Sequence, residues 1–474
     1  MPLIHPRLAL GAACAAFAAG FGSLSVLRHQ AFSTGRFDLG NMVQAVWATA
    51  HGHPLRVTDL AGEQISRLGS HFDPILVAFA PLWWLWPDPS SLLVSQSAAI
   101  AVGAPAVYLL ARRHLISERA ALCFAVAYLA YPPTQWLALN EFHPVALATP
   151  LLLWAFWFLD GDRLVPFALL ALAASLTKEQ IPLVVAAMGI WYALARGRRL
   201  AGAVIAITGV AVAALALGLV VPHFAPAGTS PFGHRYEAVG GSAGGIVKTA
   251  LTHPLRVVEE GLERRDLTYL LELLAPLAAL AFAAPLALLT ALPELAASLL
   301  SATKTQTSIH FHYTAGAIPG IVVASVLGAA RLARGRPARA ESLALLALGG
   351  VVVSNWLLGA VPAWRYVPGG ESLGSTAAHV TSHDRIAARA VALVPDNVVV
   401  SATNSLGAHL SERPRVLSFP FLFDATWVAA DETQPGYADR VSPYGTAVAL
   451  RRLRLDPAWR LVFEDDGVLV FTQR

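Results

Sequence analysis

Long apolar runs fill the first three-quarters of this sequence and limit its fold more than any other feature. A helix needs roughly 20 apolar residues to cross about 30 Å of hydrocarbon, and such runs recur from Leu8 to about residue 360. The 474 residues are 56% hydrophobic and 14% charged, with a mean hydropathy of +0.56. A soluble chain of this length does not need so much apolar surface. The sequence therefore predicts a multipass membrane protein.

Charge and cysteine content exclude several other classes. The 34 Lys and Arg residues nearly balance the 30 Asp and Glu residues and are dispersed along the chain, unlike the clustered basic surface of a nucleic-acid-binding protein. The two cysteines, Cys14 and Cys123, lie within apolar runs and form no C-x-x-C motif. A thiolate metal site and a redox-active cysteine pair are therefore excluded.

The apolar runs divide into eleven predicted membrane spans, and residues 362–474 contain none. The spans cover residues 8–27, 91–111, 118–138, 145–159, 164–177, 181–195, 200–221, 269–285, 286–302, 314–330 and 342–360. We therefore expect an all-α polytopic bundle of about 11 transmembrane helices with juxtamembrane helices over residues 1–361. A small soluble α/β domain is expected over residues 362–474, and residues 28–90 and 222–268 are expected to be long outer loops.

The distribution of arginines predicts the orientation, because short loops rich in Lys or Arg stay in the cytoplasm. Loops with arginines such as Arg112 and Arg113 place the N-terminus inside and residues 362–474 outside. The Arg-rich, Lys-poor and Ala-rich composition is typical of a GC-rich bacterial genome, so the expected location is a bacterial plasma membrane. A cleaved signal peptide over residues 1–25 is an alternative that leaves the other spans unchanged.

The apolar segment Pro74–Trp86 is expected to lie flat at the membrane interface. If it were a span, Arg112 and Arg113 would lie outside while the N-terminus stayed inside. Indole rings prefer the headgroup level, where the ring is buried and the N–H stays hydrated. The segment contains three of them, Trp83, Trp84 and Trp86.

With this topology, polar residues from five separate connections gather on the outer side of the membrane. A one-sided gathering of carboxylates, histidines and lysines indicates a site that faces outward. The candidate site residues are Asp38, His71, Asp73, Glu141, His143, Lys178, Glu179, Lys304, His310 and His312.

Several of these residues have a structural alternative. Asp38 precedes an amphipathic helix, so it is either the N-cap of that helix or a general base or metal ligand. Asp73 stands before Pro74, as an N-cap residue does. Glu141 and His143 either bind a divalent ion or a phosphate, or belong to a solvated loop.

Lys178 and Glu179 follow an apolar segment of fourteen residues, which is too short for a full crossing. Their turn should therefore be recessed, where a charge is costly without a partner. They either form an ion pair with each other, or Lys178 recognises a phosphate or carboxylate. His310 and His312 are expected to point the same way along an extended segment, unless they belong to an ordinary loop.

Other features have weaker implications. Glu294 and Glu272 are carboxylates near hydrocarbon and are weaker candidates for the site; Glu294 is also a candidate proton relay in a transporter. The loop 222–268 is either a lid or a connector. In the C-terminal part the pattern predicts helices over 383–393 and 446–453, strands over 398–401, 416–419 and 426–429, and a hairpin of 461–463 with 468–471.

The motifs together resemble a bacterial family of multipass membrane proteins of unknown function, the 2079 family. The resemblance is carried by five segments, Phe37-Asp38-Leu39-Gly40, Gly69 to Leu76, Glu141-Phe142-His143-Pro144, Lys178-Glu179 and Phe463 to Gly467. That family is similar in layout to the GT-C glycosyltransferases, which include the dolichyl-phosphate-mannose and lipid A aminoarabinose transferases.

The resemblance implies transfer of a sugar from a polyprenyl-phosphate carrier to an acceptor at the outer face of the membrane. Asp38 falls where GT-C enzymes place a first-loop acid, which acts as general base or metal ligand. Glu141 and His143 fall near the second acidic site, where the usual Asp is replaced by Glu-Phe-His. Asp38, Glu141 and His143 are thus the expected ligands of a divalent metal ion, and Lys178 is the expected cation for the carrier phosphate.

Two other functions remain open. A transporter or lipid flippase would have charged residues near the middle of the bilayer and an internal repeat. A non-catalytic anchor would present residues 362–474 to a partner in the cell envelope. The expected partners are membrane lipid and a lipid-linked sugar, and no nucleic acid.

Overall fold

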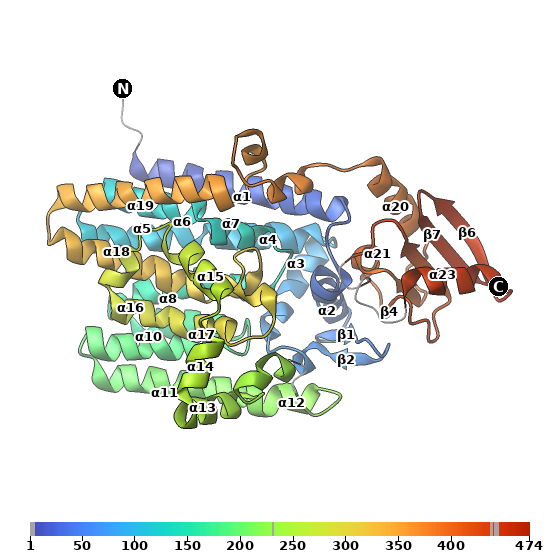
Figure 1. Cartoon of the computed structure of the whole chain (residues 1–474), viewed down its shortest axis with the longest axis horizontal. Helices are drawn as coiled ribbons and strands as arrows, with labels where there is room; N and C mark the ends of the chain where they lie inside the picture. The colour runs from blue at the N-terminus through green and yellow to red at the C-terminus, as the bar shows by residue number, and fades with distance from the viewer. Residues whose placement is uncertain (1–4, 230–231, 437–438, 440–444) are drawn as a thin grey trace.

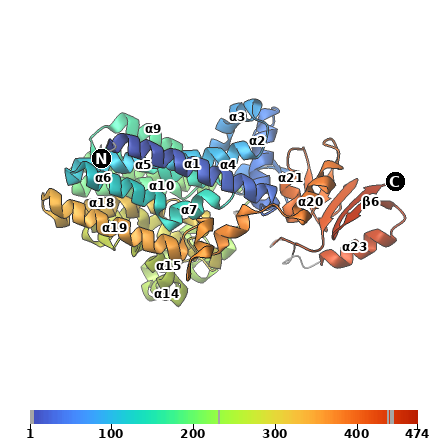
Figure 2. The ribbon, with the colours of Figure 1, turned by 90° about the horizontal axis from the view of Figure 1, so that it is seen from above.

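The computed structural model describes residues 5–229, 232–436, 439 and 445–474. A bundle of helices makes up most of the molecule, and a small C-terminal sheet with its helices lies at one end of it (Figure 1). The view from above shows the same arrangement, with the C-terminal part beyond α21 at the end of the bundle nearest α2 (Figure 2). The coarse prediction of a mostly helical membrane part followed by an α/β part is confirmed.

Four helices in the described residues are long and apolar enough to cross a membrane, by length and composition. They are α1 (Pro6–Gln30), the continuous pair α4 (Ser90–Ala101) and α5 (Gly103–Leu115), the helix that starts with α11 (Arg199–Leu215) and ends with α12 (Val221–Phe224), and α19 (Pro337–Leu358). Each coincides with one of the eleven predicted spans. The count of eleven is therefore not confirmed.

Shorter helices occupy most of the remaining predicted spans. They are α6 (Glu118–Ala130), α7 (Pro132–Leu139), α8 (Ala148–Asp160), α9 (Leu164–Ser175), α10 (Ile181–Ala195), α16 (Pro285–Leu288), α17 (Leu292–Leu299) and α18 (Ala317–Ala333). Prolines account for some of the breaks, because proline has no N–H to donate and clashes with the preceding turn. The span predicted over 118–138 is interrupted at Pro132.

The span predicted over 269–285 is wrong as a continuous helix. Helix α15 (Arg264–Leu274) ends within it, and a 3-10 turn (Leu280–Ala283) follows. Pro276 lies just beyond the helix, and Ala278 and Ala279 have positive φ, which a right-handed helix does not allow. Apolar composition alone did not reveal this interruption.

The segment between α1 and α4 packs into a small folded unit. It contains a π-helix η1 (Arg36–Gly40), α2 (Asn41–Ala50), the antiparallel strands β1 (Arg56–Thr58) and β2 (Gln64–Ser66), 3-10 turns over Arg67–Gly69 and Pro74–Phe79, and α3 (Ala80–Leu85). The apolar face of α2 is buried in a core shared with β1 and α3. The apolar face of α2 is therefore covered by protein and is not left free as in an isolated amphipathic helix.

The three tryptophans of this unit do not share one environment. Trp83 is only 2% exposed and belongs to the core beneath α2, whereas Trp84 is 66% exposed and Trp86 is 43% exposed. The expectation that all three lie at the membrane interface is therefore wrong for Trp83. Its indole packs on Leu76 and its neighbours in the core instead.

The long loop predicted over 222–268 is largely helical. After α12 it forms a 3-10 segment (Gly233–Val239), α13 (Ala243–Thr252) and α14 (Pro254–Glu260), and α15 begins at Arg264. A 3-10 turn over Lys304–Thr307 and another over His312–Thr314 connect α17 to α18. These two connections bring residues 225–229, Phe232, Arg235 and residues 312–313 to one cavity.

The C-terminal part has a five-stranded mixed sheet with strand order β4-β3-β5-β7-β6. Its strands are β3 (Val400–Ala402), β4 (Val416–Ser418), β5 (Trp427–Asp431), β6 (Trp459–Asp465) and β7 (Val468–Gln473), and its helices are α20 (Ser382–Ala392), α21 (Asn404–His409) and α23 (Thr446–Leu455). The predicted strands, hairpin and two helices are confirmed within a few residues. Helix α21, which contacts η1, was not predicted.

Candidate functional site

One cavity of about 590 Å³ collects residues from distant parts of the chain. Its walls come from η1 and the rest of the segment between α1 and α4, from the connections before α8 and α10, and from residues 225–229, Phe232, Arg235 and residues 312–313. Six of the ten predicted site residues line it, namely Asp38, His71, Asp73, His143, Lys178 and His312. These six residues come from all five of the polar connections.

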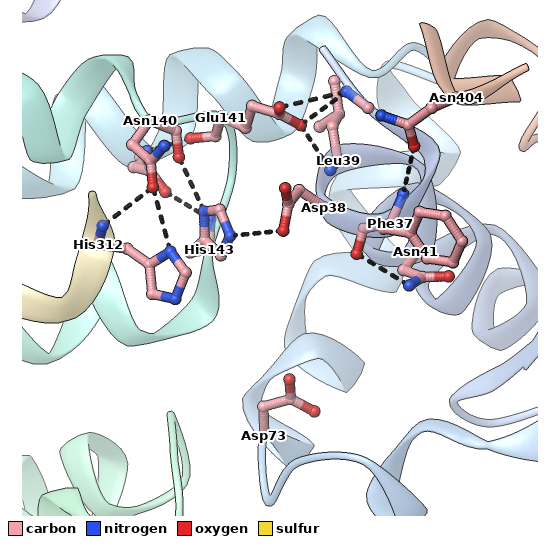
Figure 3. A network of polar contacts seen from close by, with 12 residues as sticks. Phe37, Asp38, Leu39, Asn41, Asp73, Asn140, Glu141, His143, His312 and Asn404 are labelled. Atoms are coloured by element: carbon pink, nitrogen blue, oxygen red, sulfur yellow. Dashed lines mark hydrogen bonds and ion pairs between the residues drawn. The ribbon is translucent and has the colours of Figure 1, made fainter. Parts of the chain in front are cut away.

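Asp38 projects from the π-helix η1 into the cavity. Its side chain is 54% exposed because it faces open space rather than other side chains, while the His143 side chain beside it is only 7% exposed. His143 Nε2 lies 3.3 Å from Asp38 Oδ1, and its Nδ1 lies 2.8 Å from the Asn140 carbonyl oxygen (Figure 3). Asp38 is not the N-cap of α2, because that position is Gly40.

The neighbours of Asp38 favour its charged form. Crowding by protein atoms raises the pKa of Asp38, but the hydrogen bond from His143 and the nearby positive charges of Arg67 and His71 outweigh it, so the pKa lies below its ordinary value. A carbonyl oxygen can only accept, so His143 must donate Nδ1–H to Asn140.

Glu141 lies behind Asp38 and does not line the cavity. It has a positive φ of 49°, and its two carboxylate oxygens accept hydrogen bonds from the backbone N–H of Gly35 at 3.2 and 3.1 Å and from that of Leu39 at 2.8 Å. Burial and the Asp38 charge raise the pKa of Glu141 to about 8, against the effect of these amides. Glu141 thus fixes the backbone on either side of Asp38.

The predicted metal ligands do not fit a metal ion. Both oxygens of Glu141 face backbone amides, and only Asp38 and His143 of the predicted set reach the cavity. Among the residues that the structure describes, no group of three or more His, Cys, Asp or Glu side chains is arranged to hold a metal ion. A site for a divalent cation normally needs more oxygen or nitrogen ligands than these two.

Glu179 pairs with His71, not with its neighbour Lys178. Glu179 Oε1 lies 2.9 Å from His71 Nδ1, and Oε2 accepts the backbone N–H of Phe72 at 3.0 Å. Burial raises the pKa of Glu179, but the interactions with His71 and Lys178 outweigh this effect and lower the pKa of Glu179 to about 2. One face of the His71 ring stacks on the Phe232 ring, with centroids 4.5 Å apart.

Asp73 forms a buried ion pair with Arg67, which the sequence did not single out. Arg67 Nε and Nη2 both donate to Asp73 Oδ2, at 3.0 and 2.9 Å, and the two side chains are 7% and 2% exposed. Asp73 makes no N-cap hydrogen bond, and its Oδ1 has no partner among the described residues. Burial raises the pKa of Asp73 despite Arg67. Its carboxylate is turned toward the space below Asp38 (Figure 3).

Lys178 is a buried cation at the wall of the cavity. The residue is 8% exposed, and its Nζ lies 5.1 Å from the centre of the Tyr313 ring, a cation–π contact. Within the described part of the chain, no carboxylate oxygen comes within 4.0 Å of Nζ. Arg235 lines the same cavity and stacks over Phe232 at 4.3 Å.

The remaining predicted residues lie elsewhere. Lys304 is exposed on a 3-10 turn. His310 packs its ring on Trp136, with centroids 4.7 Å apart, whereas His312 stacks on His143 at 3.7 Å. The expectation that the two histidines point the same way along an extended segment is therefore wrong, because residues 309–310 lie in a turn and a 3-10 turn begins at His312.

Of the two weaker candidates, Glu294 is buried on α17, where Gln180 Nε2 lies 3.3 Å from its Oε1. Glu272 is half-buried on α15. Neither residue lines the cavity.

Among the cavity residues that sequence reasoning missed are Arg67, Arg235 and Tyr313. Arg67 stands only four residues before His71, and Tyr313 follows His312 directly, so proximity to the polar motifs could have indicated both. Arg235 had no such signal, because it is one arginine within the long loop over 222–268. Only the folded chain brings it to Lys178 and His71.

The fold and the cavity define a polytopic helical membrane protein with a polar site between its bundle and its loops. The chain belongs to the family described as "Predicted membrane protein (DUF2079)", whose model matches residues 28–470. No curated protein matches the chain.

Solved structures of a GT-C glycosyltransferase have a similar fold. The structure of ArnT from Cupriavidus metallidurans bound to undecaprenyl phosphate is 14% identical, with a TM-score of 0.50 over 97% of both chains. The apo structure of that ArnT is 15% identical, with a TM-score of 0.48 over 92% of this chain and 93% of the other. At this identity the first likeness establishes a shared fold.

Proposed function

We propose that this protein is a GT-C-like membrane enzyme that transfers a sugar from a polyprenyl-phosphate carrier to an acceptor hydroxyl at the outer face of a bacterial plasma membrane. The observation that carries the proposal is that a carboxylate and a buried amine lie in one cavity. A carboxylate at Asp38 faces the same space as a buried amine at Lys178 that has no carboxylate within 4.0 Å among the described residues.

The cationic wall suits the phosphate of a lipid-linked sugar. Lys178 and Arg235 both line the cavity, and charge-assisted hydrogen bonds to phosphate are among the strongest in proteins. A buried lysine with no carboxylate within 4.0 Å among the described residues is costly unless a ligand supplies a closer negative charge. ArnT, which shares this fold, was solved with undecaprenyl phosphate bound, and this fits a polyprenyl-linked donor.

The reaction places Asp38 as the general base. The acceptor O–H bond breaks as the proton moves to Asp38, and the acceptor oxygen forms a bond to C1 of the sugar. The bond between C1 and the phosphate oxygen breaks, and its electron pair leaves with the polyprenyl phosphate. The added negative charge on that phosphate develops beside Lys178 and Arg235, which stabilise it in the transition state.

The remaining cavity residues hold the reactants. His143 fixes the Asp38 carboxylate through its hydrogen bond, and Glu179 orients His71. Asp73, buried and paired with Arg67, holds that guanidinium at the wall of the cavity. His312, stacked on His143, closes the same wall.

The test is transfer or hydrolysis of label from a panel of radiolabelled polyprenyl-phosphate sugars by purified protein in lipid. We expect one donor to be turned over by the wild type, and Asp38→Asn to abolish turnover while binding of the donor persists. Lys178→Ala should weaken donor binding, and Lys304→Ala is the matched control because Lys304 lies outside the cavity.

Binding and turnover of no donor across the panel would reject the proposal. The transporter alternative would then be examined with Glu294→Gln, since Glu294 is buried and its Oε2 has no partner among the described residues.

A further inference from the structure

The π-helix that carries Asp38 is anchored to the C-terminal sheet through Arg36. Arg36 is the first residue of η1 and is only 1% exposed. Its Nε and Nη2 donate to the Val416 carbonyl oxygen at 3.1 and 2.7 Å, and its Nη1 lies 2.7 Å from Ser418 Oγ. Val416 and Ser418 belong to β4, an edge strand of the sheet.

The Arg36 guanidinium is bound entirely by neutral oxygens. Its Nη2 also donates to the Thr58 carbonyl oxygen at 2.9 Å, and no carboxylate of the described residues lies within 4.0 Å of it. Burial lowers the pKa of Arg36 to about 10, so the group stays charged at neutral pH. A planar fork held at several points fixes its direction more strictly than a point charge would.

Helix α21 of the C-terminal part packs directly on the same π-helix. The side-chain oxygen Oδ1 of Asn404 accepts the backbone N–H of Phe37 at 3.3 Å. A Cβ added to Gly40 would lie 2.6 Å from Ser411 Oγ and 3.3 Å from Ala408 Cα, so η1 and α21 approach as closely as a glycine allows.

The bundle holds the opposite side of the turn. Glu141 accepts hydrogen bonds from the backbone N–H groups of Gly35 and Leu39, and Asn404 accepts one from that of Phe37 between them (Figure 3). The backbone around Asp38 is therefore clamped between two parts of the chain that are far apart in sequence. The bundle and the C-terminal sheet each supply one half of the clamp.

We propose that the C-terminal sheet supports the active site from outside the cavity, with Arg36 as the positioning residue that holds Asp38 at the reacting hydroxyl. This inference rests on the proposed function. A general base must lie within hydrogen-bond reach of its proton, and a shift of about 1 Å in such a group can cost about 100-fold in rate. Release of Arg36 from β4 would let η1 move while the phosphate-binding wall stays in place.

The first experiment compares steady-state kinetics of Arg36→Lys, Arg36→Ala and Ser418→Ala with the wild type. Arg36→Lys keeps the charge but cannot make the fork, so kcat should fall about 100-fold while the donor KM and the affinity for undecaprenyl phosphate stay unchanged. Added guanidinium should restore part of the kcat of Arg36→Ala. Ser418→Ala removes one acceptor and leaves the arginine in place, so it should lower kcat less and still fold.

Arg415→Met is the matched control. Arg415 also joins the two parts, because its Nε and Nη2 donate to the Gly62 carbonyl oxygen at 3.1 and 2.7 Å, but it does not contact η1. Its loss should leave kcat within about twofold of the wild type, as expected of a surface change away from the site. Equal losses in Arg36→Lys and Arg415→Met, or unchanged kcat in every Arg36 variant, would overturn the positioning role.

A second measurement does not depend on turnover. Amide hydrogen exchange over residues 35–40 should speed up in Arg36→Lys and not in Arg415→Met, because only the former loosens η1. Unchanged exchange in Arg36→Lys rejects the inference by itself. A donor panel without binding or turnover rejects the proposed function instead, so the two failures are distinguishable.

Discussion

Replacement of Lys178 by methionine should raise the stability of the ligand-free protein and weaken its binding of a lipid phosphate. Lys178 is 8% exposed, its Nζ lies 5.1 Å from the centre of the Tyr313 ring, and the Glu179 and Glu294 carboxylates attract it only from beyond 4.0 Å. A cation–π contact returns about 0.5–2 kcal/mol, whereas the desolvation of a buried charge costs several kcal/mol. The ligand-free site therefore carries a net cost at this position.

Methionine has a similar length and no charge to solvate. Exchange of buried charges for apolar groups of like volume can stabilise a protein by about 1–4 kcal/mol, and we expect Lys178→Met to fall near the low end of this range. The lost charge-assisted hydrogen bond is worth about 1.5–3 kcal/mol. The Kd for undecaprenyl phosphate should thus rise about 10- to 100-fold.

The assay is thermal unfolding in detergent, with and without undecaprenyl phosphate, for the wild type, Lys178→Met and Lys304→Met. Ligand at 100 times its Kd should stabilise the wild type and the Lys304 variant by about 2.7 kcal/mol, and Lys178→Met much less. The reasoning is refuted if Lys178→Met unfolds at a lower temperature without ligand and keeps the full ligand-induced shift, because Lys178 would then be a structural residue.

Three further outcomes are expected. Because the pKa of Asp38 lies below its ordinary value of 3.8, the acid loss that this group causes in a pH–rate profile of the wild type should have its midpoint below pH 3.8, and Asp38→Asn should lower kcat by about 10²- to 10⁴-fold. In the C-terminal sheet, burial lowers the pKa of His383, but its hydrogen bonds to Asp431 and Asp466, both 2.9 Å, outweigh it and hold the pKa above 6.5. This stabilisation is complete below pH 6.5 and is lost as pH rises through the raised pKa. In denaturant titrations, the free energy of unfolding of the wild type should exceed that of His383→Gln by about 1.5–3 kcal/mol at low pH, and this difference should close at high pH. A difference that widens as pH rises would contradict the assignment. Trp83→Ala should cost about 3–5 kcal/mol of unfolding free energy, whereas the exposed Trp84 should tolerate the same change, and equal losses would show that the core beneath α2 is assigned wrongly.

The elements of the C-terminal part could be predicted closely because their signals are local. The hairpin of β6 and β7 follows from alternating apolar residues around Asp465-Asp466-Gly467, and both strands form there. Helix α21 was missed because it has only six residues, fewer than two turns, and a pattern that short has no clear period.

The candidate site could be predicted as a group but not as a set of partners. Polar residues beside apolar spans identified six residues that share the cavity. The ion pairs in the cavity differ from those that neighbouring residues suggest. Glu179 pairs with His71 instead of Lys178, and Asp73 pairs with Arg67 instead of capping its own turn. Each pairing depends on which charged side chains the packing of the chain brings close together.

The sequence by itself determined that the chain has apolar spans, polar connections and an α/β end, because hydropathy and its period act over a few residues at a time. Only the tertiary structure decided that Lys178 is buried without a carboxylate within 4.0 Å among the described residues, and that Arg36 reaches Val416 across 380 residues of chain. Such contacts depend on burial, and burial is a property of the packed molecule that no local segment carries.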